Sequence, residues 1–147
     1  MRGFTTIADH RPAADVVRIL DRFFEAVASP IGPHGGEVLM FIGDAVLDIL
    51  PVRSHGPADA CARALAAAEE ALEAAQTISG SNGLPTVELG IALHLGEVMY
   101  GNIGARDRLD FMVIGRVVNE EKWSRVVDRE LIKRRPSRGD SWFSWVA

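Results

Sequence analysis

The chain has 147 residues, of which 48% are hydrophobic and 24% charged, and its formal net charge is −4. A chain of this length forms one domain that buries roughly 68–70% of its unfolded surface, and its acidic balance argues against nucleic-acid binding, which needs a basic face. The one cysteine, Cys61, excludes an intrachain disulfide and, without a neighbouring Cys/His cluster, a zinc site.

The sequence also predicts a protein of a reducing cytoplasm. The N-terminal stretch MRGFTTIADHRP has no apolar segment of the kind that a signal peptide carries. No apolar run approaches the ~20 residues that a membrane-spanning helix needs. We therefore expect a cytoplasmic domain with no membrane segment and no nucleic-acid partner.

The first half of the chain predicts two helices and a β-hairpin between them. Apolar residues recur at helical spacing through residues 12–28, with a proline near the start. Residues 37–50 are two runs of Val, Ile, Leu and Phe around Gly43-Asp44, which predicts a tight hairpin with both faces covered. Residues 57–78 are rich in alanine and begin with a proline, which predicts the clearest helix of the chain.

The next segments predict further strands. Residues 86–104 indicate a strand pair that turns near Leu95-Gly96, and residues 109–115 indicate another strand. Together these elements predict an α+β fold in which the helices pack on one face of a mostly antiparallel sheet.

The composition changes after Glu120. The remaining segment contains all three tryptophans and is rich in Lys and Arg. We expect residues 121–135 to be helical and residues 136–147 to form a loose tail. The predicted organisation is therefore a domain over 1–120 followed by a divergent segment over 121–147.

Asp44, at the tip of the predicted hairpin, is the first candidate functional residue. Aspartate is a common turn former, so a Gly-Asp turn between strands needs no other cause. The four histidines carry less information, since none stands at metal-ligand spacing to another. His94 is the one histidine inside a predicted strand, and we expect a structural role for it.

Four separated segments are informative in combination: RGFT (2–5), GGEVLMFIGDAVLDILP (35–51), LGIALHLGEVMYGNIG (89–104) and LDFMVIGRVVNE (109–120). In this combination, which covers most of residues 1–120, the chain resembles the class III nucleotidyl cyclases. Any one of the fragments alone would not be specific. The resemblance implies a ferredoxin-like α+β fold and conversion of ATP or GTP to the 3′,5′-cyclic monophosphate and pyrophosphate, for cyclic-nucleotide signalling.

The resemblance also implies roles for individual residues. Asp44 matches one of two carboxylates that hold two Mg²⁺ or Mn²⁺ ions on the triphosphate. Paired ions suit an in-line attack in which charge builds on the attacking and leaving oxygens. Gly3, Phe4 and Thr5 match the turn whose backbone amides contact the phosphates, and Asn119 matches the residue that orients the ribose.

The family's second metal-binding Asp has no counterpart in this sequence. It stands two residues before the Arg-Gly of RGFT-like segments, a position that would precede Met1, and the first strand of the fold is missing with it. We therefore expect a gap in the sheet beside the 37–50 hairpin. Asp48 does not substitute, because strand residues four positions apart lie ~13 Å apart whereas Mg²⁺–oxygen distances are ~2.0–2.1 Å.

Base recognition and transition-state stabilisation depart from the family as well. Met40 and Met112 stand at the two positions that select the purine, usually Lys and then Asp or Thr. A thioether packs on a purine face but offers no donor to its edge. Trp123 stands where the family has the arginine that stabilises the transition state, and from Glu121 onward the family's Ala-Ser-Arg string is absent.

Three functions remain open from the sequence. The first is a homodimeric adenylate or guanylate cyclase domain that is weak or inactive in this form. The second is a non-catalytic, cyclase-derived module for dimerisation or nucleotide binding. The third, independent of the resemblance, is a generic α+β ferredoxin-like interaction domain.

Two structural expectations accompany the cyclase reading. Asp44 should be exposed at the hairpin tip, close to the turn that begins at Gly3. Val98, Met99, Tyr100 and Ile103 should leave an apolar surface that one small domain cannot cover, and such a surface marks an interface.

Overall fold

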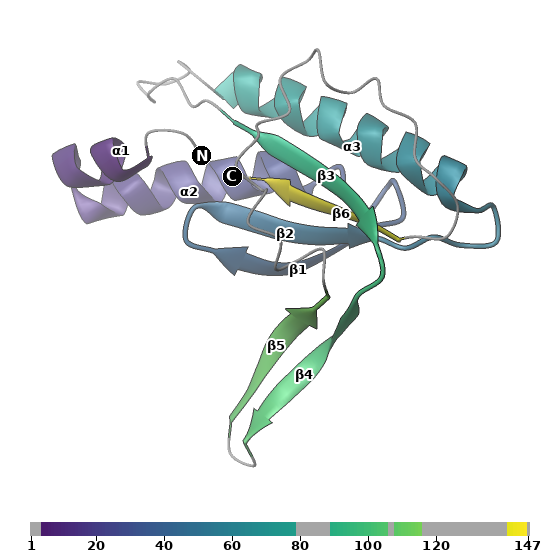
Figure 1. Ribbon diagram of the computed structural model, residues 1–147. Helices are drawn as coiled ribbons and strands as arrows, with labels where there is room; N and C mark the ends of the chain where they lie inside the picture. The colour runs from purple at the N-terminus through teal and green to yellow at the C-terminus, as the bar shows by residue number, and fades with distance from the viewer. Residues whose placement is uncertain (1–3, 79–88, 106–107, 116–140, 147) are drawn as a thin grey trace.

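The structure, a computed structural model, describes residues 4–78, 89–105, 108–115 and 141–146. In Figure 1, helices cover one face of a four-stranded sheet, and a separate two-stranded hairpin projects from the body. The described elements, in chain order, are α1 (Phe4–His10), α2 (Ala13–Ala28), β1 (Glu37–Ile42), β2 (Ala45–Leu50), α3 (Pro57–Ile78), β3 (Ile91–Gly96), β4 (Met99–Ala105), β5 (Arg108–Ile114) and β6 (Ser141–Val146). The expected α+β class, with helices on a mostly antiparallel sheet, is confirmed.

Helices α2 and α3 form where the local pattern predicts them. In α2 the buried stripe is Ile19, Phe23, Ala26 and Val27, at the spacing of one helix face, and Pro12 precedes the first turn. The buried positions of α3 are small, mostly alanine, so this helix approaches its neighbours closely. One cluster joins both helices to the sheet through Val46 of β2 and Ile91 of β3.

The predicted hairpin is present, with β1 and β2 antiparallel around a two-residue turn. Gly43 has φ +62, the left-handed conformation that glycine adopts without a steric penalty. All six residues of β2 are buried, as expected for a strand covered on both faces. The expectation is wrong for β1, whose burial pattern is mixed because the strand lies at the edge of the described sheet.

The centre of the sheet contains the main correction to the sequence interpretation. Its strand order is β1-β2-β6-β3, and β6 pairs antiparallel with both β2 and β3. The loose tail expected over 136–147 is therefore wrong for 141–146. The gap expected beside the hairpin is wrong as well, because β6 fills it. Trp, Phe and Val favour strands, and β6 satisfies the backbone groups that β2 and β3 would otherwise leave unpaired.

The strands after α3 also pair differently from the expectation. The chain does leave β3 at Gly96, but β3 pairs with β6 and not with β4. The partner of β4 is β5, which corresponds to the strand predicted over 109–115. The segment 121–135, for which a helix was expected, lies outside the described residues.

The Gly-Gly of the hairpin motif has a packing role at the end of the sheet away from Asp44. A Cβ built on Gly36 would lie 2.8 Å from Ile31 Cγ2 and 2.9 Å from Leu50 Cγ, so only glycine fits there without a shift. Gly35 has φ +78. Arg63 of α3 lies at the same end of the domain and contacts the loop before β1.

Arg63 holds three segments together by donating hydrogen bonds from all three guanidinium nitrogens. Its Nη1 reaches the His34 carbonyl oxygen at 2.8 Å, and its Nη2 reaches the Pro51 carbonyl oxygen at 3.1 Å. Its Nε pairs with Asp59 Oδ2 at 2.8 Å on the same helix. The loop before β1, the end of β2 and the start of α3 are thereby fixed relative to one another.

Candidate functional site

The hairpin tip places Asp44 between the ends of two paired strands. Ile42 and Ala45, the strand residues that flank the turn, are register partners, so the turn is tight. The Asp44 side chain is half-buried, whereas we expected it to be exposed. A packed hairpin fixes the backbone of such a residue and so orients its carboxylate.

The N-terminal helix α1 packs against the hydrophobic core. Phe4, the first residue of α1, is half-buried and packs against the cluster that contains Val46, two residues after Asp44. Thr5 is exposed. Gly3 lies outside the described residues, so the expected contact between that turn and Asp44 stays a prediction.

The two methionines at the purine-selecting positions lie in different sheets. Met40 of β1 is half-buried and stands opposite Leu47 of β2. Because the neighbouring Phe41 is opposite Val46 of the core, Met40 belongs to the sheet face that points away from the helices. Met112 of β5 is 45% exposed.

Two further positions of the predicted site lie outside the described residues. These are Asn119, expected to orient the ribose, and Trp123, which replaces the expected arginine. Their roles stay predictions that rest on the resemblance.

The carboxylates do not fit a two-ion centre within the part of the chain that the structure describes. No group of three or more His, Cys, Asp or Glu side chains gathers there in a way that could hold a metal ion. Asp48 is fully buried in β2, where its register partner in β6 is Ser144, and it does not share the hairpin turn with Asp44. Asp44 and Asp48 therefore do not form a pair of carboxylates that could share two metal ions.

The projecting hairpin of β4 and β5 carries an apolar face. The register places Met99 opposite Ile114 and Gly101 opposite Met112, and alternation adds Ile103 to the same face. These side chains are substantially exposed: Met99 74%, Ile103 43%, Met112 45% and Ile114 48%. Exposed apolar side chains gathered on one projecting ribbon are uncommon in monomeric proteins.

The sequence predicts only some of the exposed residues of this surface. Met99, Tyr100 and Ile103 are exposed as expected, whereas Val98 is half-buried. Val98 lies against the end of β5, since a Cβ on Gly115 would be 2.7 Å from its Cγ1. Met112 and Ile114 were missed as surface residues, although their spacing of two in a predicted strand places them on one face.

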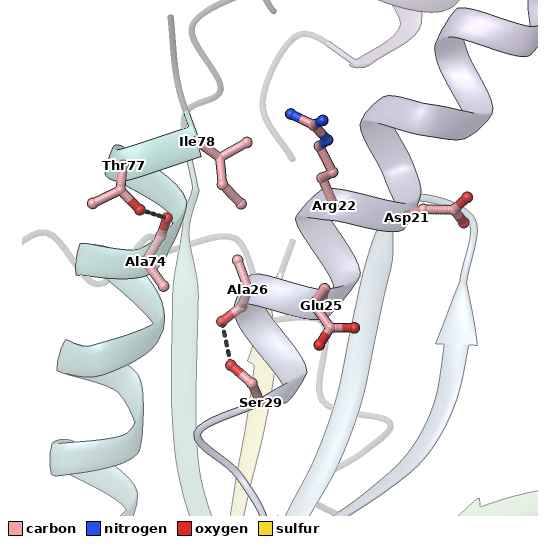
Figure 2. Close-up of a pocket in the computed structure, with 8 residues that line it drawn as sticks. All are labelled: Asp21, Arg22, Glu25, Ala26, Ser29, Ala74, Thr77 and Ile78. Atoms are coloured by element: carbon pink, nitrogen blue, oxygen red, sulfur yellow. Dashed lines mark hydrogen bonds between the residues drawn. The ribbon is translucent and has the colours of Figure 1, made fainter. Parts of the chain in front are cut away.

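A hollow lies between the C-terminal halves of α2 and α3 (Figure 2). Arg22 and Glu25 approach it from α2, and Thr77 and Ile78 from α3. Ser29 and Thr77 donate their hydroxyl protons to carbonyl oxygens of their own helices, Ala26 and Ala74. No buried polar group points into this hollow among its lining residues, so it is not part of the candidate site.

None of the described helices combines the length and apolarity that crossing a bilayer requires. The expectation of a chain without a membrane segment is tested only for these helices.

The comparisons with known proteins agree with the motifs and the fold. No protein-family model matches the chain. The uncharacterized proteins Rv1319c and Rv1318c of Mycobacterium tuberculosis are 37% and 39% identical to it over 140 residues, or 92% of this chain. The chain spans about a quarter of the length of these relatives, 24% and 23% respectively.

Two solved structures resemble the fold. The guanylyl cyclase Cya2 superposes with a TM-score of 0.71 and 26% identity, over 100% of this chain and 87% of that one. A bacterial light-regulated adenylyl cyclase superposes with a TM-score of 0.66 and 25% identity, over 78% of this chain and 59% of that one. Together with the motifs around Asp44, these neighbours identify the chain as a class III nucleotidyl cyclase-like domain.

Proposed function

We propose that the chain is a cyclase-derived domain that binds ATP or GTP as a homodimer, in the cytoplasm, with cyclase turnover at or near background. The observation that carries the proposal is Asp44 on a tight hairpin tip in a fold shared with nucleotidyl cyclases. A half-buried carboxylate on a fixed turn is suited to hold the Mg²⁺ or Mn²⁺ that accompanies a nucleoside triphosphate.

Low turnover is supported by the composition of β6, which ends near the hairpin tip. Val146 of β6 is the register partner of Val46, so β6 runs to the same end of the sheet as Asp44. The residues of β6 are Ser, Trp, Phe, Ser, Trp and Val, and none carries a carboxylate. Strand β6 therefore brings no carboxylate to this end of the sheet, whereas a two-ion clamp needs shared carboxylates.

Weak discrimination between ATP and GTP follows from the methionines. Met40 and Met112 pack on either purine but donate no hydrogen bond to its edge. A site without base-edge donors separates two purines poorly, because strong discrimination comes from leaving a buried polar group unpaired. We expect similar affinities for both nucleotides.

The dimer is supported by the apolar face of β4 and β5. The face contains Met99 and Ile103 on one strand and Met112 and Ile114 on the other. A second copy of the same face would cover these side chains around a twofold axis. Such an arrangement places Met112 at the interface, where it can also contact the nucleotide.

The alternative function is a dimerisation module that does not bind nucleotide. The same exposed face favours it, and it requires nothing of Asp44. Nucleotide binding separates the two functions, because only the first predicts that binding depends on Asp44 and on a divalent ion.

The test measures binding of fluorescent ATP and GTP analogues to residues 1–147 with Mn²⁺, with Mg²⁺ and with EDTA, alongside cyclic-nucleotide formation. We expect metal-dependent binding that Asp44→Ala weakens, and product at background. Glu73→Ala, which removes an exposed carboxylate from α3, is the matched control. Absence of saturable nucleotide binding would leave the dimerisation module as the function, and binding that is unchanged in EDTA and in Asp44→Ala would remove Asp44 and the divalent ion from the nucleotide site. Product formed at the rate of an intact cyclase would refute the inactive state.

A further inference from the structure

The outer edge of β1 carries exposed aromatic surface that the proposed nucleotide site does not use. Among the described strands β1 has one neighbour, β2, so its other edge offers backbone donors and acceptors. Phe41 and Ile42 are 55% and 47% exposed. The Phe41 ring rests against the Phe24 ring of α2, with centroids 4.6 Å apart and planes at 45°.

Two carboxylates stand beside this aromatic pair. A hollow between α2 and the β1 edge is lined by Phe24 and Phe41 together with Asp21, Glu25 and two small residues. Asp21 and Glu25 are exposed and one helical turn apart. In Figure 2 the Asp21 side chain points away from α3, although Asp21 and Glu25 also line the hollow between α2 and α3 to which Arg22 belongs. Neither carboxylate is paired with a cation of the described residues.

These groups define the chemistry of an occupant. A free strand edge recognises an extended polypeptide by main-chain hydrogen bonds. Phenyl rings accept the alkyl stem of Lys or Arg, and the two carboxylates accept its charge. We propose that the β1 edge docks an extended segment of a partner protein that carries Lys or Arg beside apolar residues.

A second copy of this chain is the simplest competing occupant of the β1 edge, and charge repulsion disfavours it. Two copies of this chain paired edge to edge through β1 would bring two sets of Asp21 and Glu25 toward each other. Like charges in that position are repulsive. The surface therefore favours a basic partner over a second copy, and it is distinct from the β4–β5 face proposed for dimerisation.

The docked stretch is short. The pairing of β1 with β2 is irregular between Val38 and Met40 and regular from Met40 to Ile42. A bulge twists an edge and limits strand addition. The proposal is thus of a transient contact, centred on Phe41 and one basic side chain.

The test uses a fluorescein-labelled nonapeptide in which Lys alternates with Val and Thr, added to residues 1–147 at low salt. Anisotropy should report saturable binding, and amide exchange should slow at Phe41, because N–H groups alternate along a strand and that of Ile42 faces β2 across the turn. Asp21→Lys with Glu25→Lys should weaken binding about two- to thirty-fold, the range for two exposed ion pairs. Glu69→Lys with Glu73→Lys, an equal charge change on the exposed side of α3, should not act specifically.

A second peptide separates strand addition from charge attraction. It has the same side chains but carries N-methyl groups on alternate amides, so it cannot complete a ladder. We expect it to bind at least tenfold more weakly. Equal binding of both peptides, equal losses in the two double variants, or unchanged exchange at Phe41 would each overturn the proposal.

Discussion

The apolar face of β4 and β5 predicts that Met99→Ser weakens a dimer strongly. Fully burying a methionine side chain stabilises by ~1.5–3 kcal/mol, and Met99 exposes 74% of its surface in the single chain. Covering that fraction is worth about 1–2 kcal/mol per protomer. A twofold interface uses the residue twice, so the substitution should cost about 2–4 kcal/mol, or roughly 30- to 1,000-fold in the dimer dissociation constant.

Sedimentation equilibrium over a wide concentration range measures this constant directly. Val17→Ser is the matched control, because Val17 is also apolar and 54% exposed but lies on α2, away from the hairpin. We expect it to leave the dissociation constant unchanged. A wild-type chain that stays monomeric at high concentration would refute the interface. A Met99→Ser dimer as tight as the wild type would refute the assignment of this face.

Three further changes test the fold and the tip. Gly36→Ala should destabilise the domain by about 1–3 kcal/mol in urea titrations, because its Cβ would lie 2.8 Å from Ile31 Cγ2; an unchanged midpoint would contradict the packing. Ser144→Pro should lower the free energy of unfolding by at least ~1 kcal/mol, because proline removes a ladder donor from a strand with two neighbours; unchanged stability would show that β6 is dispensable. Asp44→Ala should weaken Mn²⁺-dependent nucleotide binding, measured by titration, because it removes the carboxylate proposed to hold the ion; unchanged binding would remove Asp44 from the site.

The elements that the sequence predicts well are those with a local cause. Composition and flanking residues predict the observed boundaries of α3, and α2 begins one residue after Pro12. Gly43-Asp44 forms the hairpin turn because the turn needs only glycine's left-handed conformation and two β-forming runs. Asp44 could accordingly be placed at a tip before any tertiary contact was known.

Strand pairing was predicted poorly because pairing is not local. The segments that form β3 and β4 are adjacent in sequence, yet each pairs with another strand. Periodicity identifies a strand and its faces but not its neighbour. The Ser/Trp-rich run that forms β6 has high strand propensity. Its position in the sheet, however, depends on β2 and β3, which lie far away in the chain.

The position of β6 between β2 and β3 links the stability of the sheet to the chemistry at the hairpin tip. Strand β6 pairs with β2, whose six residues are all buried. A strand that is covered on both faces favours apolar residues. A metal centre would instead require a carboxylate on the strand beside Asp44, at a cost in desolvation. Residues 141–146 meet the first demand and carry no group for the second. A domain with this central strand can therefore retain the cyclase-like fold without a carboxylate on the strand beside Asp44, which is the arrangement that the proposed function requires for turnover at or near background.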